Sequence, residues 1–177
     1  MDLMRLMAPG RPLFAVLVGP HPQREALLDL IAALAFAGPV HVLDGGNHFD
    51  PIRIAYRIRA HTPDLMTYAD RIRVVRAFTC VEVLRALQAQ EAGPPLIIMD
   101  MLATFYDEAV SHRRSGLLVA ECLQEIRRLK APVLASVRNG QPADGPRAHL
   151  LQALVDAADL VDEPSERLAA PAELRLF

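Results

Sequence analysis

Five short runs of mainly apolar residues, separated by longer segments, constrain the fold of this chain more than any other feature. A strand that is apolar at every position is typical of a sheet buried on both faces. Strands joined through helices pair in parallel, because such a connection crosses over the sheet. We therefore predict an α/β fold, with helices on both faces of a mostly parallel sheet in three layers. The predicted strands cover residues 13–18, 40–43, 72–75, 96–99 and 133–137.

The segments between these runs carry the periodicity and end signals of helices. Asp50 followed by Pro51 is typical of a helix start, and Thr79 with Glu82 matches a capping box. The predicted helices are 25–37, one opening at Asp50, one from Thr79 to Gly93, 116–130 and 148–157.

Nothing in the sequence divides the chain, so residues 1–177 are predicted as one domain. Residues 1–11 form an N-terminal extension in this prediction. The segment 158–177 contributes terminal strands, with 160–161 and 173–177 expected to pair as a hairpin.

Composition excludes several classes of protein. Hydrophobic residues make up 52% of the 177 residues, which excludes a mainly disordered chain. The formal net charge is -2, so the overall field favours neither nucleic acid nor an acidic membrane surface. Of the 19 basic residues all but Lys130 are arginine.

The two cysteines and the apolar stretches indicate where the protein works. Cys80 and Cys122 lie among apolar residues without CxxC spacing, so we expect buried, reduced thiols. The N-terminal residues lack the continuous apolar centre of a signal peptide. No apolar stretch reaches the roughly 18 residues of a membrane span. A cytoplasmic protein is expected.

Polar residues follow three of the predicted strands at their ends. Gly19 follows the first strand, Asp44 the second and Asp100 the fourth. The carboxyl ends of parallel strands share the sheet edge at which open α/β sheets bind ligands. A glycine turn before a helix is typical of a phosphate cradle, and a carboxylate after an apolar strand is typical of magnesium binding in nucleotide hydrolases. The alternative for each aspartate is a turn or helix-cap residue.

Three consecutive segments resemble the ATPase core of the RecA/RadA-type recombinases and their KaiC-like relatives. Residues 42–54 (VLDGGNHFDPIRI) are similar to the family's Y-I-D-T-E-G-T-F-R-P-E-R-L segment, and residues 71–87 to its next strand and helix. Residues 96–107 (LIIMDMLATFYD) look like the strand that carries the family's Walker B aspartate, here Asp100. The resemblance covers residues 12–162 and implies a RecA-like P-loop NTPase fold.

The phosphate loop implied by this resemblance is degenerate. The family has G-x-x-x-x-G-K-[ST], whereas residues 19–26 read GPHPQREA and keep only Gly19. Arg24 stands at the second glycine, Glu25 at the lysine and Ala26 at the magnesium-binding hydroxyl. A carboxylate among phosphates is unfavourable, since like charges about 4 Å apart repel by about 4 kcal/mol at an effective dielectric constant of 20.

Further catalytic positions have lost their residues. The family's water-activating glutamate aligns with Gly46, its neighbouring threonine with Gly45, and its γ-phosphate-sensing glutamine with Val137. Phosphoryl transfer depends on positioned charge, so these losses predict no ATPase activity. We expect a non-catalytic RecA-like paralogue, a scaffold or regulatory subunit acting through protein contacts. Only the resemblance implies a setting in DNA recombination or repair.

The alternative hypothesis is a protein that binds ATP without hydrolysing it. In that case Asp100 retains magnesium and Arg24 replaces the charge of the lysine. Gly19 and His21 complete the vestigial nucleotide site. The leading hypothesis requires no cofactor, and the alternative requires ATP and magnesium.

A metal site is a separate hypothesis for the same edge. Asp44, His48 and Asp100 carry ligand types that suit magnesium, manganese or zinc. In the competing explanation Asp50 is needed as a helix cap, and His48 lies in a glycine-rich turn that faces water. We predict no metal site, and Asp44, His48 and Asp100 remain the candidate ligands.

Two arginine-bearing loops suggest contacts with DNA, and the aliphatic composition suggests contacts with protein. Recombinases hold DNA with two loops, which correspond here to candidate contacts Arg113 and Arg114, and Arg138 and Arg147. The chain is net acidic, so DNA binding is not favoured, and paired arginines at a helix start are also expected simply to be solvated. The broad aliphatic content favours a surface for a protein partner or a second copy.

Overall fold

The structure is a computed structural model that describes residues 3–8, 12–19, 23–107, 110–138, 145 and 147–163. Its strands are β1 (Leu13–Gly19), β2 (Val40–Asp44), β3 (Ile72–Arg76), β4 (Leu96–Met99), β5 (Pro132–Arg138) and β6 (Leu160–Asp162). They form one open sheet in the order β3-β2-β4-β5-β1-β6, and every neighbouring pair is parallel. The predicted α/β class with a mostly parallel sheet is confirmed.

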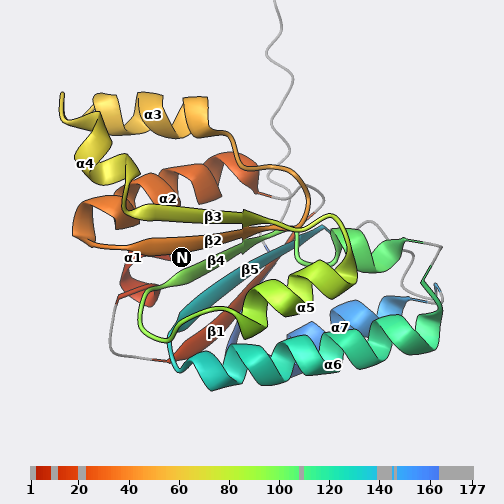
Figure 1. The fold of residues 1–177 in the computed structure, drawn as a ribbon. Helices are drawn as coiled ribbons and strands as arrows, with labels where there is room; N and C mark the ends of the chain where they lie inside the picture. The colour runs from red at the N-terminus through yellow and green to blue at the C-terminus, as the bar shows by residue number, and fades with distance from the viewer. Residues whose placement is uncertain are drawn as a thin grey trace, which may run out of the picture.

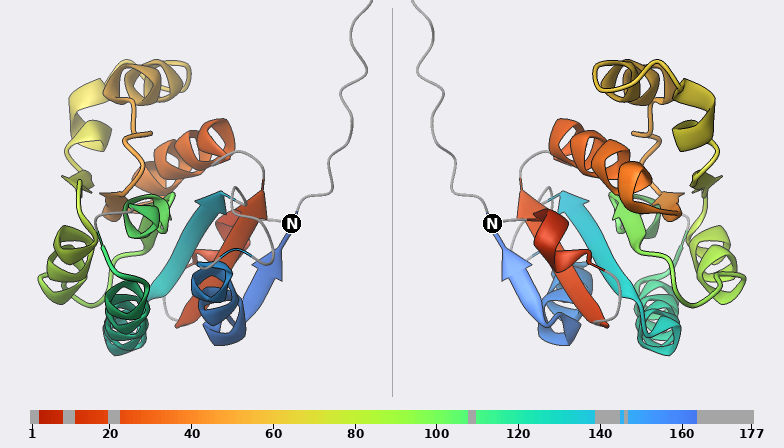
Figure 2. Two further views of the ribbon diagram at one scale, coloured as in Figure 1. Left: turned by 90° about the vertical axis from the view of Figure 1, so that its right-hand side faces the viewer. Right: turned by 90° about the vertical axis from the view of Figure 1, so that its left-hand side faces the viewer.

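Helices cover both faces of the sheet, which gives three layers (Figures 1 and 2). One face is covered by α5 (Cys80–Gln88), α6 (His112–Leu129) and α7 (Ala148–Ala157). The other face is covered by α1 (Leu3–Leu6), α2 (Arg24–Ala37), α3 (Pro51–Arg59) and α4 (Leu65–Ala69). A short 3₁₀ helix, η1 (Ala103–Tyr106), follows β4.

The strand β1 shows why a continuous apolar run forms a strand here. Phe14 and Val16 pack with the core under α5, α6 and α7, whereas Ala15 and Leu17 pack with the core under α2. Successive side chains of a strand point to opposite faces, so a strand between two helical layers is apolar at every position.

The helix starts predicted at Asp50 and Thr79 are confirmed. The Asp50 carboxylate accepts hydrogen bonds from the backbone N–H groups of Ile52 and Arg53, at 3.0 and 3.1 Å. Thr79 and Glu82 form the reciprocal capping box. These side chains satisfy N–H groups that have no partner within the helix, which fixes where α3 and α5 begin.

Several other boundaries differ from the prediction. The helix predicted to reach Gly93 ends at Gln88, and the helix predicted from residue 116 begins at His112. The predicted strand at 160–161 is part of β6, which pairs in parallel with β1. Residues 173–177 lie outside the described residues.

Both cysteines are buried and free, as the sequence predicted. Burial raises the pKa of the Cys122 thiol to about 12, so this group is a neutral part of the core. None of the helices in the described ranges is long and apolar enough to cross a membrane.

Candidate functional site

The carboxyl edge of the sheet brings together the strand ends that the sequence singled out. Gly19 ends β1, Asp44 ends β2, Asp100 directly follows β4, and Arg138 ends β5. The helices that follow β1 and β2 cover one face, and those that follow β4 and β5 cover the other. In two neighbouring pairs of strands, β2 with β4 and β5 with β1, the helices that follow the two strands therefore lie on opposite faces of the sheet. Open α/β sheets bind ligands at such points.

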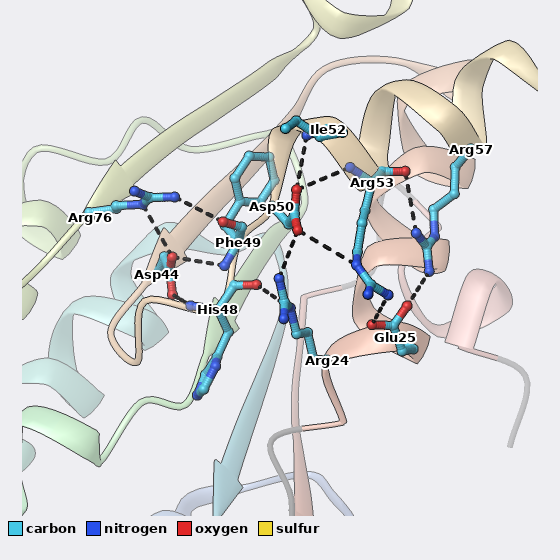
Figure 3. A network of polar contacts seen from close by, with 10 residues as sticks. All are labelled: Arg24, Glu25, Asp44, His48, Phe49, Asp50, Ile52, Arg53, Arg57 and Arg76. Atoms are coloured by element: carbon cyan, nitrogen blue, oxygen red, sulfur yellow. Dashed lines mark hydrogen bonds and ion pairs between the residues drawn. The ribbon is translucent and has the colours of Figure 1, made fainter.

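Asp44 holds the loop that follows β2. Its two carboxylate oxygens accept hydrogen bonds from the backbone N–H groups of His48, at 2.8 Å, and Phe49, at 2.9 Å (Figure 3). The Arg76 Nε, at the end of β3, lies 3.4 Å from the same buried carboxylate. Asn47, at a φ of 57°, turns the loop back on itself. Asp44 is thus bound by the protein's own backbone and by an arginine.

Asp100 is also buried and bound by protein groups. Arg138 Nη2 lies 3.0 Å from its Oδ2, and His48 Nε2 lies 3.3 Å from the same oxygen. The Asp100 N–H donates to Ser136 Oγ at 2.9 Å. Its φ of 52° is uncommon for a residue with a Cβ, and residues in strained conformations cluster at functional sites.

Gly46 fits between these groups because it has no side chain. A Cβ at this position would lie 2.5 Å from His48 Cδ2 and 2.7 Å from Asp100 Cβ. Both distances are shorter than any ordinary van der Waals contact. Position 46 therefore has no room for a side chain unless its neighbours move.

Arg24, at the start of α2, is bound to the loop after β2. Its Nε donates to the His48 carbonyl oxygen at 2.9 Å, and its Nη2 pairs with the Asp50 carboxylate at 2.9 Å (Figure 3). The preceding residue, Gln23, has a φ of 52° and provides no side-chain cap to the helix. The guanidinium thus ties the first turn of α2 to the start of α3.

Glu25 makes its contacts with α3. Its carboxylate oxygens pair with Arg53 and Arg57, each at 2.7 Å (Figure 3). The hydrogen bond from Arg57 lowers the pKa of Glu25 from its ordinary value. The repulsion predicted for a phosphate next to this carboxylate is therefore reduced, because two guanidinium groups compensate the negative charge.

The prediction that His48 faces water is wrong in part. Its ring contacts Asp100, and 24% of the side chain is exposed. The carboxylates of Asp44 and Asp100, the other metal-ligand candidates, are each bound by an arginine. In the residues that the structure describes, no three His, Cys, Asp or Glu side chains are arranged to hold a metal ion.

The four arginines proposed as DNA contacts have three different environments. Arg113 and Arg114 are exposed in the first turn of α6. Arg138 is half-exposed and pairs with Asp100. His21 and residues 139–144 and 146 lie outside the described residues, so most of the second loop has no structural account.

The environment of Arg147 differs from that expected of a DNA contact. It is buried, and its guanidinium donates to the carbonyl oxygens of Phe105, at 2.8 Å, and Val110, at 2.7 Å. Its Nε donates to His112 Nδ1 at 3.2 Å. These contacts join the start of α7 to the segment between η1 and α6, so the group does not face solvent for a phosphate.

Sequence reasoning missed three partners of the buried carboxylates, namely Arg76, Ser136 and the His48 ring. It also missed Tyr106, whose pKa is raised to about 12 by burial and by the negative charge of Asp100. Arg76 and Ser136 lie at or near the ends of strands that neighbour β2 and β4. Strand order was the signal required to find them.

Comparison of the chain with known protein families and with curated proteins finds no match. The description of the site therefore rests on the contacts at the carboxyl edge of the open, all-parallel sheet. One buried carboxylate ends β2 and the other directly follows the neighbouring β4, and each is bound by an arginine from a further strand. Chemically, this arrangement neutralises charge and fixes loops. Arg24 and Arg138 keep 38% and 50% of their side chains exposed at the same edge.

Proposed function

We propose that the protein is a non-catalytic RecA-like subunit that acts as a scaffold or regulator through protein contacts. Its RecA-like identity, and with it a setting in DNA recombination or repair, rests on the sequence resemblance. The observation that carries the non-catalytic role is the pairing of Asp100 with Arg138 at 3.0 Å. A carboxylate that binds a guanidinium is a poor magnesium ligand, because the cation occupies its oxygen and repels the metal.

The packing around the other aligned positions supports the same proposal. Gly46, at the position of the base, lies against His48 and Asp100. Val137, at the sensor position, is fully buried in the core under α5, α6 and α7. Lys130 caps the C-terminal end of α6, just before β5 begins, and so lies at the opposite edge of the sheet from α2's first turn.

A second candidate is the protein that holds ATP without hydrolysing it. The N-cap residue of α2, Gln23, makes no side-chain hydrogen bond to the first turn, and helix N-termini favour anions. Arg24 and Arg138 are partly exposed at the same edge and would supply positive charge. Both arginines already bind carboxylates, so a nucleotide would have to compete with Asp50 and Asp100.

Thermal unfolding with and without ATP and magnesium separates the two candidates. A ligand present at 100 times its dissociation constant stabilises by about 2.7 kcal/mol, roughly 5–10 °C for a chain of this length. We expect no shift at millimolar ATP. A saturable shift that needs magnesium and is lost in Asp100→Ala would establish the second candidate. We also expect no ATPase activity, with Asp100→Ala indistinguishable from the unmodified protein in turnover.

Restoring the phosphate loop tests the alignment itself. The triple variant Arg24→Gly, Glu25→Lys and Ala26→Thr is expected to gain ATP affinity without hydrolysis, because Gly46 still offers no base. The matched control carries Glu25→Ala in place of Glu25→Lys, so that it loses the same ion pairs with Asp50, Arg53 and Arg57. A folded triple variant that binds ATP no better than this control would show that the turn does not correspond to a phosphate loop.

A further inference from the structure

The strand β3 is an exposed edge of the sheet. It pairs with β2 on one side, and no other described strand pairs with it. Four of its five residues are exposed, whereas every residue of β2 and β4 is buried. An exposed edge strand with apolar side chains is a template for pairing with another chain.

The hydrogen bonds to β2 show which backbone groups of β3 are directed outward. Val40 N–H donates to the Arg71 carbonyl at 2.9 Å, and Ala77 N–H donates to the Asp44 carbonyl at 3.0 Å. Backbone groups alternate in direction along a strand, so the odd-numbered residues bond to β2. Val74, at the middle of the strand, therefore directs its N–H and C=O away from the sheet.

Most of the exposed large apolar side chains come from the stretch of sequence that contains β3. Of the nine large apolar side chains that are exposed in the described part of the chain, six lie between the start of α3 and the start of α5. The elements that carry them lie on the side of the molecule away from β6 (Figure 2). We call these six residues the β3 surface, which comprises Ile52, Tyr56, Met66, Val74, Val75 and Phe78.

We propose that the β3 surface binds a second copy of this chain through antiparallel pairing of the two β3 strands about a two-fold axis. With Val74 opposite Val74 of the partner subunit, each Val74 donates one N–H and accepts one. Arg73 then lies opposite Val75 of the partner subunit, so no arginine faces another arginine directly. The inference deepens the proposed function, since it names the partner of the scaffold.

The two exposed aromatic side chains supply part of the area that a dimer requires. An aromatic side chain offers roughly 150–250 Å², so Tyr56 and Phe78, each 70% exposed, supply roughly 200–350 Å² between them. A stable interface uses roughly 800 Å² from each partner, to which the four aliphatic side chains and the strand backbone also contribute.

The symmetry of the pairing favours β3 over the other edge. The strand β6 has three residues, and pairing β3 of one copy with β6 of the next would continue without closing. Pairing β3 with itself uses the same surface twice and stops at two copies. Arg76 is compensated by Asp44 within its own subunit, which limits repulsion between the two strands.

Sedimentation equilibrium and light scattering of the full chain test this dimer. We expect a monomer–dimer equilibrium at micromolar concentration. Val74→Pro removes the outward N–H and leaves the bonds to β2, so it should raise the dissociation constant about tenfold or more, because two hydrogen bonds are lost per dimer. Val74→Thr keeps the N–H and the branched shape, and it should stay near the unmodified value. Leu117→Asp changes an exposed apolar residue on α6 and should have no effect.

Hydrogen exchange of the unmodified chain provides a second measurement that needs no substitution. Amides of residues 72–76 should become more protected as protein concentration rises, while those of α6 stay constant. A monomer at every concentration, or a dimer that Val74→Pro leaves unchanged, would overturn the proposal. A monomer whose stability does not change with ATP would overturn the dimer and leave the proposed scaffold function in place. A dimer that is stabilised by ATP and magnesium would keep the dimer and favour the second candidate, the protein that holds ATP.

Discussion

Replacing Gly46 with alanine tests whether the loop after β2 is packed as tightly as the structure indicates. The added Cβ would lie 2.5 Å from His48 Cδ2 and 2.7 Å from Asp100 Cβ. Asp100 is buried and held by Arg138, so it has little freedom to move. The His48 ring is partly exposed and will be displaced first, with the loss of its contact with Asp100.

The expected cost of Gly46→Ala follows from this geometry. Inserting one methyl group into a packed site costs about 1–3 kcal/mol. For a chain of this length, that corresponds to a fall in Tm of roughly 2–12 °C. Gly38→Ala is the matched control, because no atom lies within 4 Å of its added Cβ and its φ of 168° is extended backbone. It should be neutral, or stabilising by up to about 1 kcal/mol through the unfolded chain.

Urea and thermal unfolding at neutral pH measure both changes, and a double-mutant cycle assigns the clash. In a His48→Ala background, Gly46→Ala should cost less, since the ring is gone. A residual cost should remain, because Asp100 Cβ is still 2.7 Å away. The reasoning is refuted if Gly46→Ala is as stable as Gly38→Ala, or if its cost is the same with and without the His48 ring.

Three further predictions follow from the buried polar groups. Asp44→Ala removes the acceptor of two backbone N–H groups and should cost about 3 kcal/mol in urea unfolding, with Asp44→Asn costing less because one acceptor oxygen remains. Arg147→Met leaves two backbone carbonyls without this donor and should cost about 2–4 kcal/mol, and Arg147→Lys should not restore stability because lysine lacks the planar fork. Cys122 and Tyr106 have pKa values raised to about 12 from ordinary values of 9.0 and 10.0. The folded state holds these protons more tightly than the unfolded chain, so the free energy of unfolding should be level near pH 8 and fall from pH 9 toward 12, as pH-dependent urea titrations would measure.

The strands could be predicted closely because turn residues bound each apolar run. The strand predicted at 96–99 is β4 itself, and the strand predicted at 40–43 is one residue shorter than β2. The helix α6 begins four residues before the predicted 116, because its first turn, HRRS, is polar and carries no apolar periodicity. The helices α4 and η1 were not predicted, since five and four residues are too few for a helical period to show.

The candidate site could be predicted in its location and not in its contacts. Parallel pairing alone places Gly19, Asp44 and Asp100 on one edge, and the structure has them there. The partner of each carboxylate depends on which strands are neighbours, and periodicity does not give strand order. Arg138 reaches Asp100 because β5 lies next to β4, although the two residues are 38 positions apart.

In the proposed resemblance to RecA/RadA-type recombinases, Asp100 takes the position of a magnesium ligand, yet protein groups bind its carboxylate and its N–H. Its carboxylate neutralises Arg138, and its N–H is satisfied by Ser136 Oγ. A residue at a φ of 52° persists only where its neighbours hold it, and alanine at this position would keep the strain while removing the partner of the arginine. The effect of Asp100→Ala is therefore expected in stability and not in turnover. An aspartate after an apolar strand does not by itself indicate phosphate chemistry, because the groups that face its oxygens decide what it binds.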